Sequence, residues 1–326
     1  MLVTEEIDRR NRRRAFGVAA LILPASLLLG LLHPVFLALL LVAPVLFWMA
    51  RAPYLRRKAA AARPFTAPWQ AILENRVRFY RALEPDEKLR FRQMVNVFLD
   101  EVRITGVRTE VDDTVRLLVA ASAIVPIFGF RDWEYSRLGE VLIYPSSFDA
   151  DYRTTNSVDE NLLGLAGFGH LRGVVILSKP SLLRAFSDLP IEEHVGVHEF
   201  AHLVEQEVIE GGLPAEIPNE AMREWVRYVG RELRHPSHRH AWINDYAYTN
   251  DREFFAVLSE YFFGSPEALR ARDPDLYDLM RKIFHQDPAA LFAKLRAPGA
   301  TWPRNAACPC ASGQKFAECC LGERGE

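Results

Sequence analysis

A long segment without charged side chains limits how the N-terminal region can fold. No Asp, Glu, Lys or Arg occurs within residues 15–50. As one helix, this segment would extend roughly 54 Å, well beyond the ~30 Å hydrocarbon core of a bilayer. His33 and Pro34 lie near its middle, and proline disfavours a helical conformation at the residue before it. The sequence therefore predicts a transmembrane helical hairpin with arms at about residues 15–32 and 35–50.

Basic residues flank both arms and indicate how the hairpin is oriented. Positively charged flanks stay in the cytoplasm, and a hairpin leaves both of its ends on the same side. We therefore expect the rest of the chain to face the cytoplasm at the inner or plasma membrane. Each arm is short for a full span, so a shallow re-entrant hairpin is one alternative, and a single tilted span is another. The flanking residues are Arg9, Arg10, Arg12, Arg13, Arg14, Arg51, Arg56, Arg57 and Lys58.

A second constraint is the pattern His-Glu-x-x-His at residues 198–202. Two histidines four residues apart share one face of a helix, so His198 and His202 can bind one Zn²⁺ at ~2.0–2.1 Å. Glu199 can then reach a water on the metal as a general base. The pattern predicts hydrolysis of a peptide bond by zinc-activated water. The alternative is a helix that happens to carry two histidines.

A zinc site of this type needs a third protein ligand and leaves the fourth position to water. Downstream, an apolar helix is expected from Asp251 to a break at Gly264, with Glu253 near its start and Glu260 two turns later. A carboxylate on so apolar a helix is rarely buried without a partner. We predict Glu253 as the third ligand and Glu260 as its support or substitute. Either could instead be a cap or surface carboxylate.

These segments resemble the Mlc titration factor A family of zinc-dependent peptidases. The resemblance rests on residues 198–202 and on Tyr-Ala-x-x-Asn-Asp-x-Glu-Phe-Phe-Ala-Val-Leu-Ser-Glu-Tyr-Phe-Phe at residues 246–263, and it extends over about residues 66–290. It implies a zinc metallopeptidase, and it leaves open whether the enzyme is an aminopeptidase or cuts internally. The family is named for sequestering a transcriptional repressor. The alternative function is therefore binding of a transcriptional regulator or another protein partner.

The resemblance also implies a role for individual residues. His198, His202 and Glu253 would bind the catalytic zinc, and Glu199 would be the base. Tyr246, seven residues before the glutamate ligand, would stabilise the oxyanion. An ordinary packed aromatic is the alternative for Tyr246.

All four cysteines lie close together near the C-terminus, in two pairs separated by a short Gly-containing turn. This is metal-ligand spacing, although a disulfide is the alternative. The run resembles the SEC-C motif, with Ala311 where glycine is usual. That resemblance implies one structural zinc on Cys308, Cys310, Cys319 and Cys320. A site closed by four cysteines has no open position for catalysis.

The sequence as a whole indicates an α+β fold, in which a mainly helical zincin-like domain contains a small β-sheet. Short β-branched runs predict strands at Gly139–Tyr144 and Gly173–Ser178, and the second could pair with an extended substrate as an edge strand. The net charge of −2 gives no indication of nucleic-acid binding. The expected organisation is residues 1–58 for the basic segment and hairpin, 59–66 for a linker, 67–296 for the peptidase domain and 300–326 for the SEC-C motif.

Overall fold

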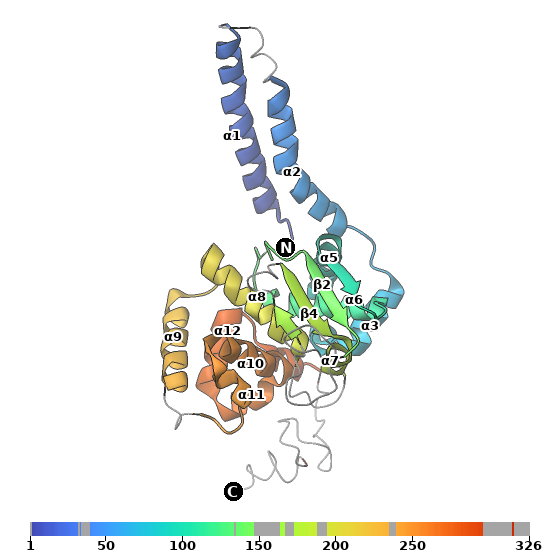
Figure 1. Cartoon of the computed structure of the whole chain (residues 1–326), viewed down its shortest axis with the longest axis vertical. Coiled ribbons are helices and arrows are strands. Elements are labelled where there is room, and N and C mark those ends of the chain that lie inside the picture. Colours follow the sequence, from blue (N-terminus) through green and yellow to red (C-terminus); the bar gives the residue numbers. More distant parts are fainter. Residues whose placement is uncertain are drawn as a thin grey trace.

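A helical hairpin projects from a mainly helical domain that contains a small β-sheet (Figure 1). This arrangement agrees with the predicted α+β class. The computed structural model describes residues 2–31, 33, 40–133, 135–146, 164–166, 173–187, 194–234, 239–295 and 315. The four cysteines of the predicted structural zinc site lie outside these residues.

The hairpin consists of α1 (Glu5–Gly30) and α2 (Val42–Ala61), which pack against each other. Both helices extend beyond the predicted arms toward the domain, and α2 runs into the segment expected to be a linker. None of the helices in the described parts of the chain is long and apolar enough to cross a membrane. The prediction of a transmembrane hairpin therefore finds no support in the structure.

Ion pairs form where the helices continue through the basic flanks. The carboxylate of Asp8 is 2.9 Å from the side chains of both Arg12 and Lys58, and it also pairs with Arg51. Arg56 of α2 lies 2.7 Å from Asp100, which belongs to α5 (Pro85–Glu101). The basic residues thus join the two arms to each other and to the domain.

The sheet contains four strands in the order β1-β2-β4-β3. β1 (Arg103–Gly106), β2 (Glu140–Tyr144) and β4 (Val174–Ser178) are parallel, while β3 (Gly164–Ala166) is antiparallel to β4. Parallel neighbours need a long crossover, and α6 (Asp113–Ile127) supplies it between β1 and β2.

The strand predicted at Gly173–Ser178 is present, but the suggested role as an edge strand that pairs with substrate is wrong, and the alternative of a structural strand holds. Within this segment, β4 pairs with β2 on one side and with β3 on the other, so neither of its edges is free. The physical reason is the antiparallel pairing of another segment, β3, with the second edge of β4. The sequence of β4, Val-Val-Ile-Leu, indicates only that both faces of the strand are covered.

The other helices surround this sheet or form the C-terminal half of the domain (Figure 1). Two helical segments are each divided by one non-helical residue. Residues 69–83 are interrupted at Val77, which has extended backbone angles, and residues 266–281 are interrupted at Asp273, just before Pro274. The remaining elements are α3 (Ala67–Arg76), α4 (Arg78–Ala82), α7 (Lys179–Ala185), α8 (Val195–Gly211), α9 (Asn219–Arg234), η4 (Asp245–Thr249), α10 (Asp251–Gly264), α11 (Pro266–Arg272), α12 (Pro274–Phe284) and α13 (Pro288–Ala293).

Close packing of α8 against α6 fixes the position of the predicted metal helix. A Cβ atom built on Gly196 would lie 2.0 Å from the Oγ and 2.6 Å from the Cβ of Ser122, so only glycine fits there. Ser122 is fully buried, and its hydroxyl donates to the carbonyl of Leu118 at 2.9 Å. Gly196 is in the first turn of α8, two residues before His198. Its contact with Ser122 therefore fixes the position of this part of α8 relative to α6.

Candidate metal centre and active site

The helix α8 carries His198, Glu199 and His202. It begins after His194, whose Nδ1 accepts the backbone N–H of Val197 at 3.3 Å. Burial lowers the pKa of His194 to about 4, so its ring is neutral and can accept this bond. One turn separates His198 from His202, and their ring centroids are 4.9 Å apart. The two imidazoles therefore lie side by side, as the spacing predicts.

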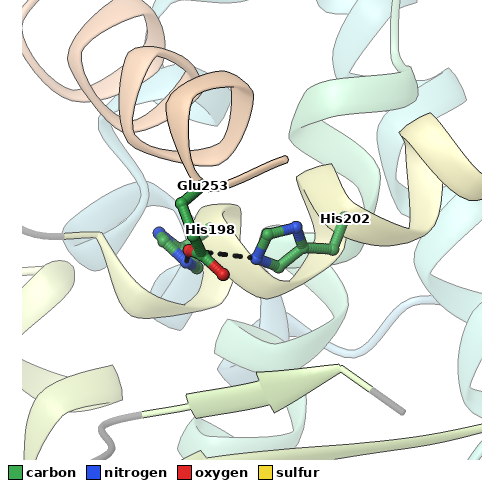
Figure 2. Close-up of side chains that lie close together, drawn as sticks. All are labelled: His198, His202 and Glu253. Atoms are coloured by element: carbon green, nitrogen blue, oxygen red, sulfur yellow. Dashed lines mark hydrogen bonds and ion pairs between the residues drawn. The ribbon is translucent and has the colours of Figure 1, made fainter. Parts of the chain in front are cut away.

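The helix α10 brings Glu253 to the two histidines (Figure 2). Asn250 caps this helix, and its side-chain oxygen accepts the N–H groups of Arg252 and Glu253, each at 3.0 Å. This cap places Glu253 in the first turn, facing α8. Its Oε2 lies 3.1 Å from Nε2 of His198 and 3.5 Å from Nε2 of His202. The three potential ligand atoms all lie within 4.8 Å of one another.

The geometry of this group fits a zinc ion. Ligand atoms at ~2.0–2.1 Å in a tetrahedral shell are about 3.4 Å apart, close to the observed 3.1 and 3.5 Å. Two histidines and a glutamate form a known ligand set of catalytic zinc, with the fourth position open.

The electrostatics of the group agree with a cation at its centre. Burial opposes the charged form of His198, but hydrogen bonds to Glu253 and Glu260 outweigh it and raise the pKa of His198 well above its ordinary value. Burial also acts to raise the pKa of Glu253, yet the two histidines hold it well below the usual range. The carboxylates thus favour positive charge between the rings, which a divalent cation would supply.

Glu260 lies on the far side of His198 from Glu253. Its Oε1 is 2.7 Å from Nδ1 of His198, and its Oε2 accepts the backbone N–H of His194. A carboxylate at this nitrogen fixes the orientation of a ligand histidine and leaves Nε2 for the metal. Glu260 is therefore placed to support His198 and not to replace Glu253. In contrast, Nδ1 of His202 is buried without a hydrogen-bond partner among the described residues.

Glu199 and Tyr246 lie beside the metal group. Glu199 is only 4% exposed, and its charge acts on both His198 and Tyr246. Tyr246 belongs to η4, and its ring centroid is 6.2 Å from that of His198. Burial, followed by the charges of Glu253 and Glu199, raises the pKa of Tyr246 to about 12. Its phenol therefore remains protonated at neutral pH and can donate a hydrogen bond.

One ion pair beside the metal group was not predicted from the sequence. Arg252 of α10 lies 3.3 Å from Glu205 of α8, so the two helices are joined by an ion pair next to the metal group. Burial raises the pKa of Glu205, while Arg252 opposes this. The neighbouring positions of Arg252 and Glu253 in the first turn of α10 are the only sequence signal for this contact.

One helix carries His-Glu-x-x-His, and a second helix supplies a glutamate. This arrangement is typical of zinc metallopeptidases. Comparison with protein families agrees with this class. Residues 52–285 match the model of the family described as glucose-regulated metallo-peptidase M90, and residues 304–322 match the SEC-C motif. The chain belongs to the M90 metallopeptidase family, whose members hydrolyse peptide bonds, and it carries a C-terminal SEC-C motif. The predicted resemblance is thereby confirmed.

Individual relatives cover most of the domain. The uncharacterized protein slr2042 of Synechocystis sp. is 28% identical over 244 residues, which is 72% of this chain and 89% of that protein. Mlc titration factor A of Escherichia fergusonii is 26% identical over 242 residues, or 70% of this chain and 89% of the relative. For Mlc titration factor A of Cronobacter sakazakii the identity is 26% over 254 residues, with 74% and 93% covered.

Proposed function

We propose that the chain hydrolyses peptide bonds with a zinc ion held by His198, His202 and Glu253. The observation that carries this proposal is the meeting of Glu253 from α10 with both histidines of α8 at 3.1 and 3.5 Å. A zinc ion bound there would act as a Lewis acid and would lower the pKa of a coordinated water to about 7.

The surrounding residues supply the proton transfers and the hydrogen bonds. Glu199 accepts the proton of the attacking water and delivers it to the leaving amine. Tyr246 donates its phenolic proton in a hydrogen bond to the oxygen on which negative charge develops. Glu260 holds the ring of His198 through Nδ1 and so keeps Nε2 directed at Glu253.

The direct test of this proposal is a digest of a mixed peptide library by the full chain. We expect cleavage by zinc-loaded protein, loss of cleavage after chelation, and recovery when zinc is returned. Removal of single N-terminal residues would identify an aminopeptidase, and internal cuts would identify an endopeptidase. If zinc-loaded, folded protein cleaves no peptide in the library, the proposed activity is refuted for peptide substrates.

Replacing Tyr246 with Phe is expected to lower kcat without lowering zinc affinity. Loss of one oxyanion donor costs roughly 10²–10³-fold in kcat, and we expect the lower end because Tyr246 is 47% exposed. The matched control is Tyr248→Phe, since the Tyr248 hydroxyl accepts a hydrogen bond from the backbone N–H of His240 at 2.8 Å. Steady-state kinetics on one cleaved peptide compares the two. A drop in the Tyr248 variant alone would transfer the role to Tyr248.

A second candidate function is binding of a regulatory protein. It is favoured by the names of the relatives from Escherichia fergusonii and Cronobacter sakazakii, which describe titration of Mlc. A partner captured equally well by wild type and Glu199→Gln would support this function, because the substitution leaves the surface unchanged. A protein captured to different extents by wild type and Glu199→Gln would instead be a substrate, because its capture depends on catalytic turnover.

The location and the C-terminal motif complete the proposal. The basic flanks favour a cytoplasmic position of the domain at the inner or plasma membrane, with the hairpin as the anchor. The match to the SEC-C motif supports a structural zinc on Cys308, Cys310, Cys319 and Cys320. Such a site would stabilise a C-terminal module and take no part in the chemistry at His198.

A further inference from the structure

We propose that the base of the α1–α2 hairpin binds the headgroups of anionic phospholipids, while its apolar end inserts into the bilayer from one side without spanning it. This inference rests on the proposed membrane association and does not depend on the peptidase chemistry. It is carried by three features of the hairpin: a cationic cavity at its base, exposed apolar side chains beyond that cavity, and the order in which these two features lie along the helices.

The cavity at the base of α1 has a volume of about 540 Å³, within the range of small-molecule sites. Phe16 lines it on the side toward the hairpin end, and two acidic residues, Glu5 and Asp8, also contribute. Four cationic side chains outnumber these acids. They are Arg9, Arg12, Arg13 and Lys58.

The acidic residues of the cavity do not neutralise it. Asp8 is 5% exposed, and hydrogen bonds from Lys58, Arg51 and Arg12 hold its pKa far below the usual range. The negative charge of Asp8 is therefore already compensated by more than one cationic side chain. Arg9 has only a loose, exposed contact of 3.9 Å with Glu5. Arg13 is exposed, and it forms no ion pair with any residue that the structure describes.

Beyond the cavity, apolar side chains of the hairpin are exposed. On α1, Leu21 is 75% and Leu28 is 68% exposed, and Leu31 just after the helix is 84% exposed. Trp48 of α2 is 65% exposed. So many large apolar side chains on one projecting element mark a surface that is covered by a partner or a membrane. Other exposed apolar residues of the hairpin are Phe16, Val18, Leu27, Leu41, Val42, Val45, Leu46 and Met49.

The order of charge and apolarity along the hairpin favours a lipid bilayer over a protein partner. α1 begins next to the domain and ends at the far tip (Figure 1), so the arginines lie at the base and the leucines toward the tip. The rings of Phe16 and Phe47, 5.1 Å apart, join the two helices at the boundary, next to Trp48. Tryptophan is enriched at this depth of a membrane, and basic clusters bind anionic headgroups.

The length of the apolar part fits insertion from one side. From Phe16 to Gly30 the helix rises roughly 21 Å, which exceeds the ~15 Å of one leaflet and falls short of the ~30 Å core. A hairpin inserted to this depth brings Arg9, Arg12 and Arg13 to the level of the headgroups.

The test is flotation of the full chain with two kinds of vesicle, phosphatidylcholine alone and phosphatidylcholine with one third phosphatidylglycerol. The variant is Arg9→Gln with Arg13→Gln. The matched control is Arg223→Gln with Arg227→Gln, also two exposed arginines four residues apart on a helix, α9. At about 1 kcal/mol per basic residue, we expect the Arg9/Arg13 variant to bind the anionic vesicles roughly tenfold to thirtyfold more weakly. The control should stay within about twofold of wild type.

Three results would overturn the inference. They are equal binding of wild type and the Arg9/Arg13 variant, absence of wild-type binding to anionic vesicles, and displacement by excess inorganic phosphate, which would identify a site for free phosphate. A Leu28→Asp variant tests insertion separately, because it should lose binding to both kinds of vesicle. Melting curves confirm that each variant is folded. Cleavage of a soluble peptide by the same preparations reports on the peptidase independently, so failure of one proposal is not mistaken for failure of the other.

Discussion

Replacing Glu199 with Gln is expected to abolish most peptide hydrolysis while the catalytic zinc stays bound. Glutamine has the same shape but cannot accept a proton, so the attacking water keeps its proton and the leaving amine receives none. General acid–base catalysis of this kind contributes roughly 10²–10⁴-fold to the rate. Glu199 is 4% exposed and is not one of the three clustered ligands, so metal affinity should change little. Both kcat and the zinc content of the purified protein would be measured.

The matched control for this variant is Glu207→Gln on the same helix. Glu207 accepts hydrogen bonds from the backbone and hydroxyl of Ser136, the former at 2.7 Å, and takes no part in the metal group. We expect it to keep wild-type turnover at a slightly lower melting temperature. Near-normal turnover in Glu199→Gln would refute the role of this residue. Equal loss of zinc and activity would mean that Glu199 acts on the metal site and not as the base.

The local part of the site is predictable from sequence because it depends on helix geometry alone. His198 and His202 share a face for any straight helix, and the carboxylates of an apolar helix, Glu253 and Glu260, are candidates for the third ligand. What the sequence leaves open is how the two helices meet. The position of Glu260 on the Nδ1 side of His198 depends on the packing of α10 against α8, which no local pattern encodes.

Contacts between distant segments account for the other differences. The glycine at position 196 is required because Ser122 of another helix lies against it, and nothing near Gly196 in the sequence indicates this. Beyond Ala50, α2 forms ion pairs with distant segments, such as that between Arg56 and Asp100, which no local pattern indicates. The Val-Val-Ile-Leu run of β4 indicates a strand that is covered on both faces, but it does not indicate the pairing of its edge with β3.

Replacing Glu253 with Gln is expected to lower zinc affinity at the catalytic site by more than about 100-fold, the upper end of what loss of an outer hydrogen-bonding partner costs. A neutral amide oxygen is a poor ligand, and the two histidines then remain without a carboxylate between them. Asp251→Asn is the matched control, because it removes the same charge from the first turn of the same helix at an exposed position. Competition with a chromophoric chelator measures the affinity.

The zinc proposed for the cysteines must be separated from the catalytic zinc in this measurement. Repeating the titration in a Cys308→Ser, Cys310→Ser background leaves one expected zinc, which Glu253→Gln should weaken and Asp251→Asn should not. Unchanged affinity in Glu253→Gln would refute the ligand assignment. Glu260 could not simply take its place, since its carboxylate lies 2.7 Å from Nδ1 of His198. Coordination by Glu260 would require the ring of His198 to turn over, and it would break the hydrogen bonds that join α10 to the start of α8.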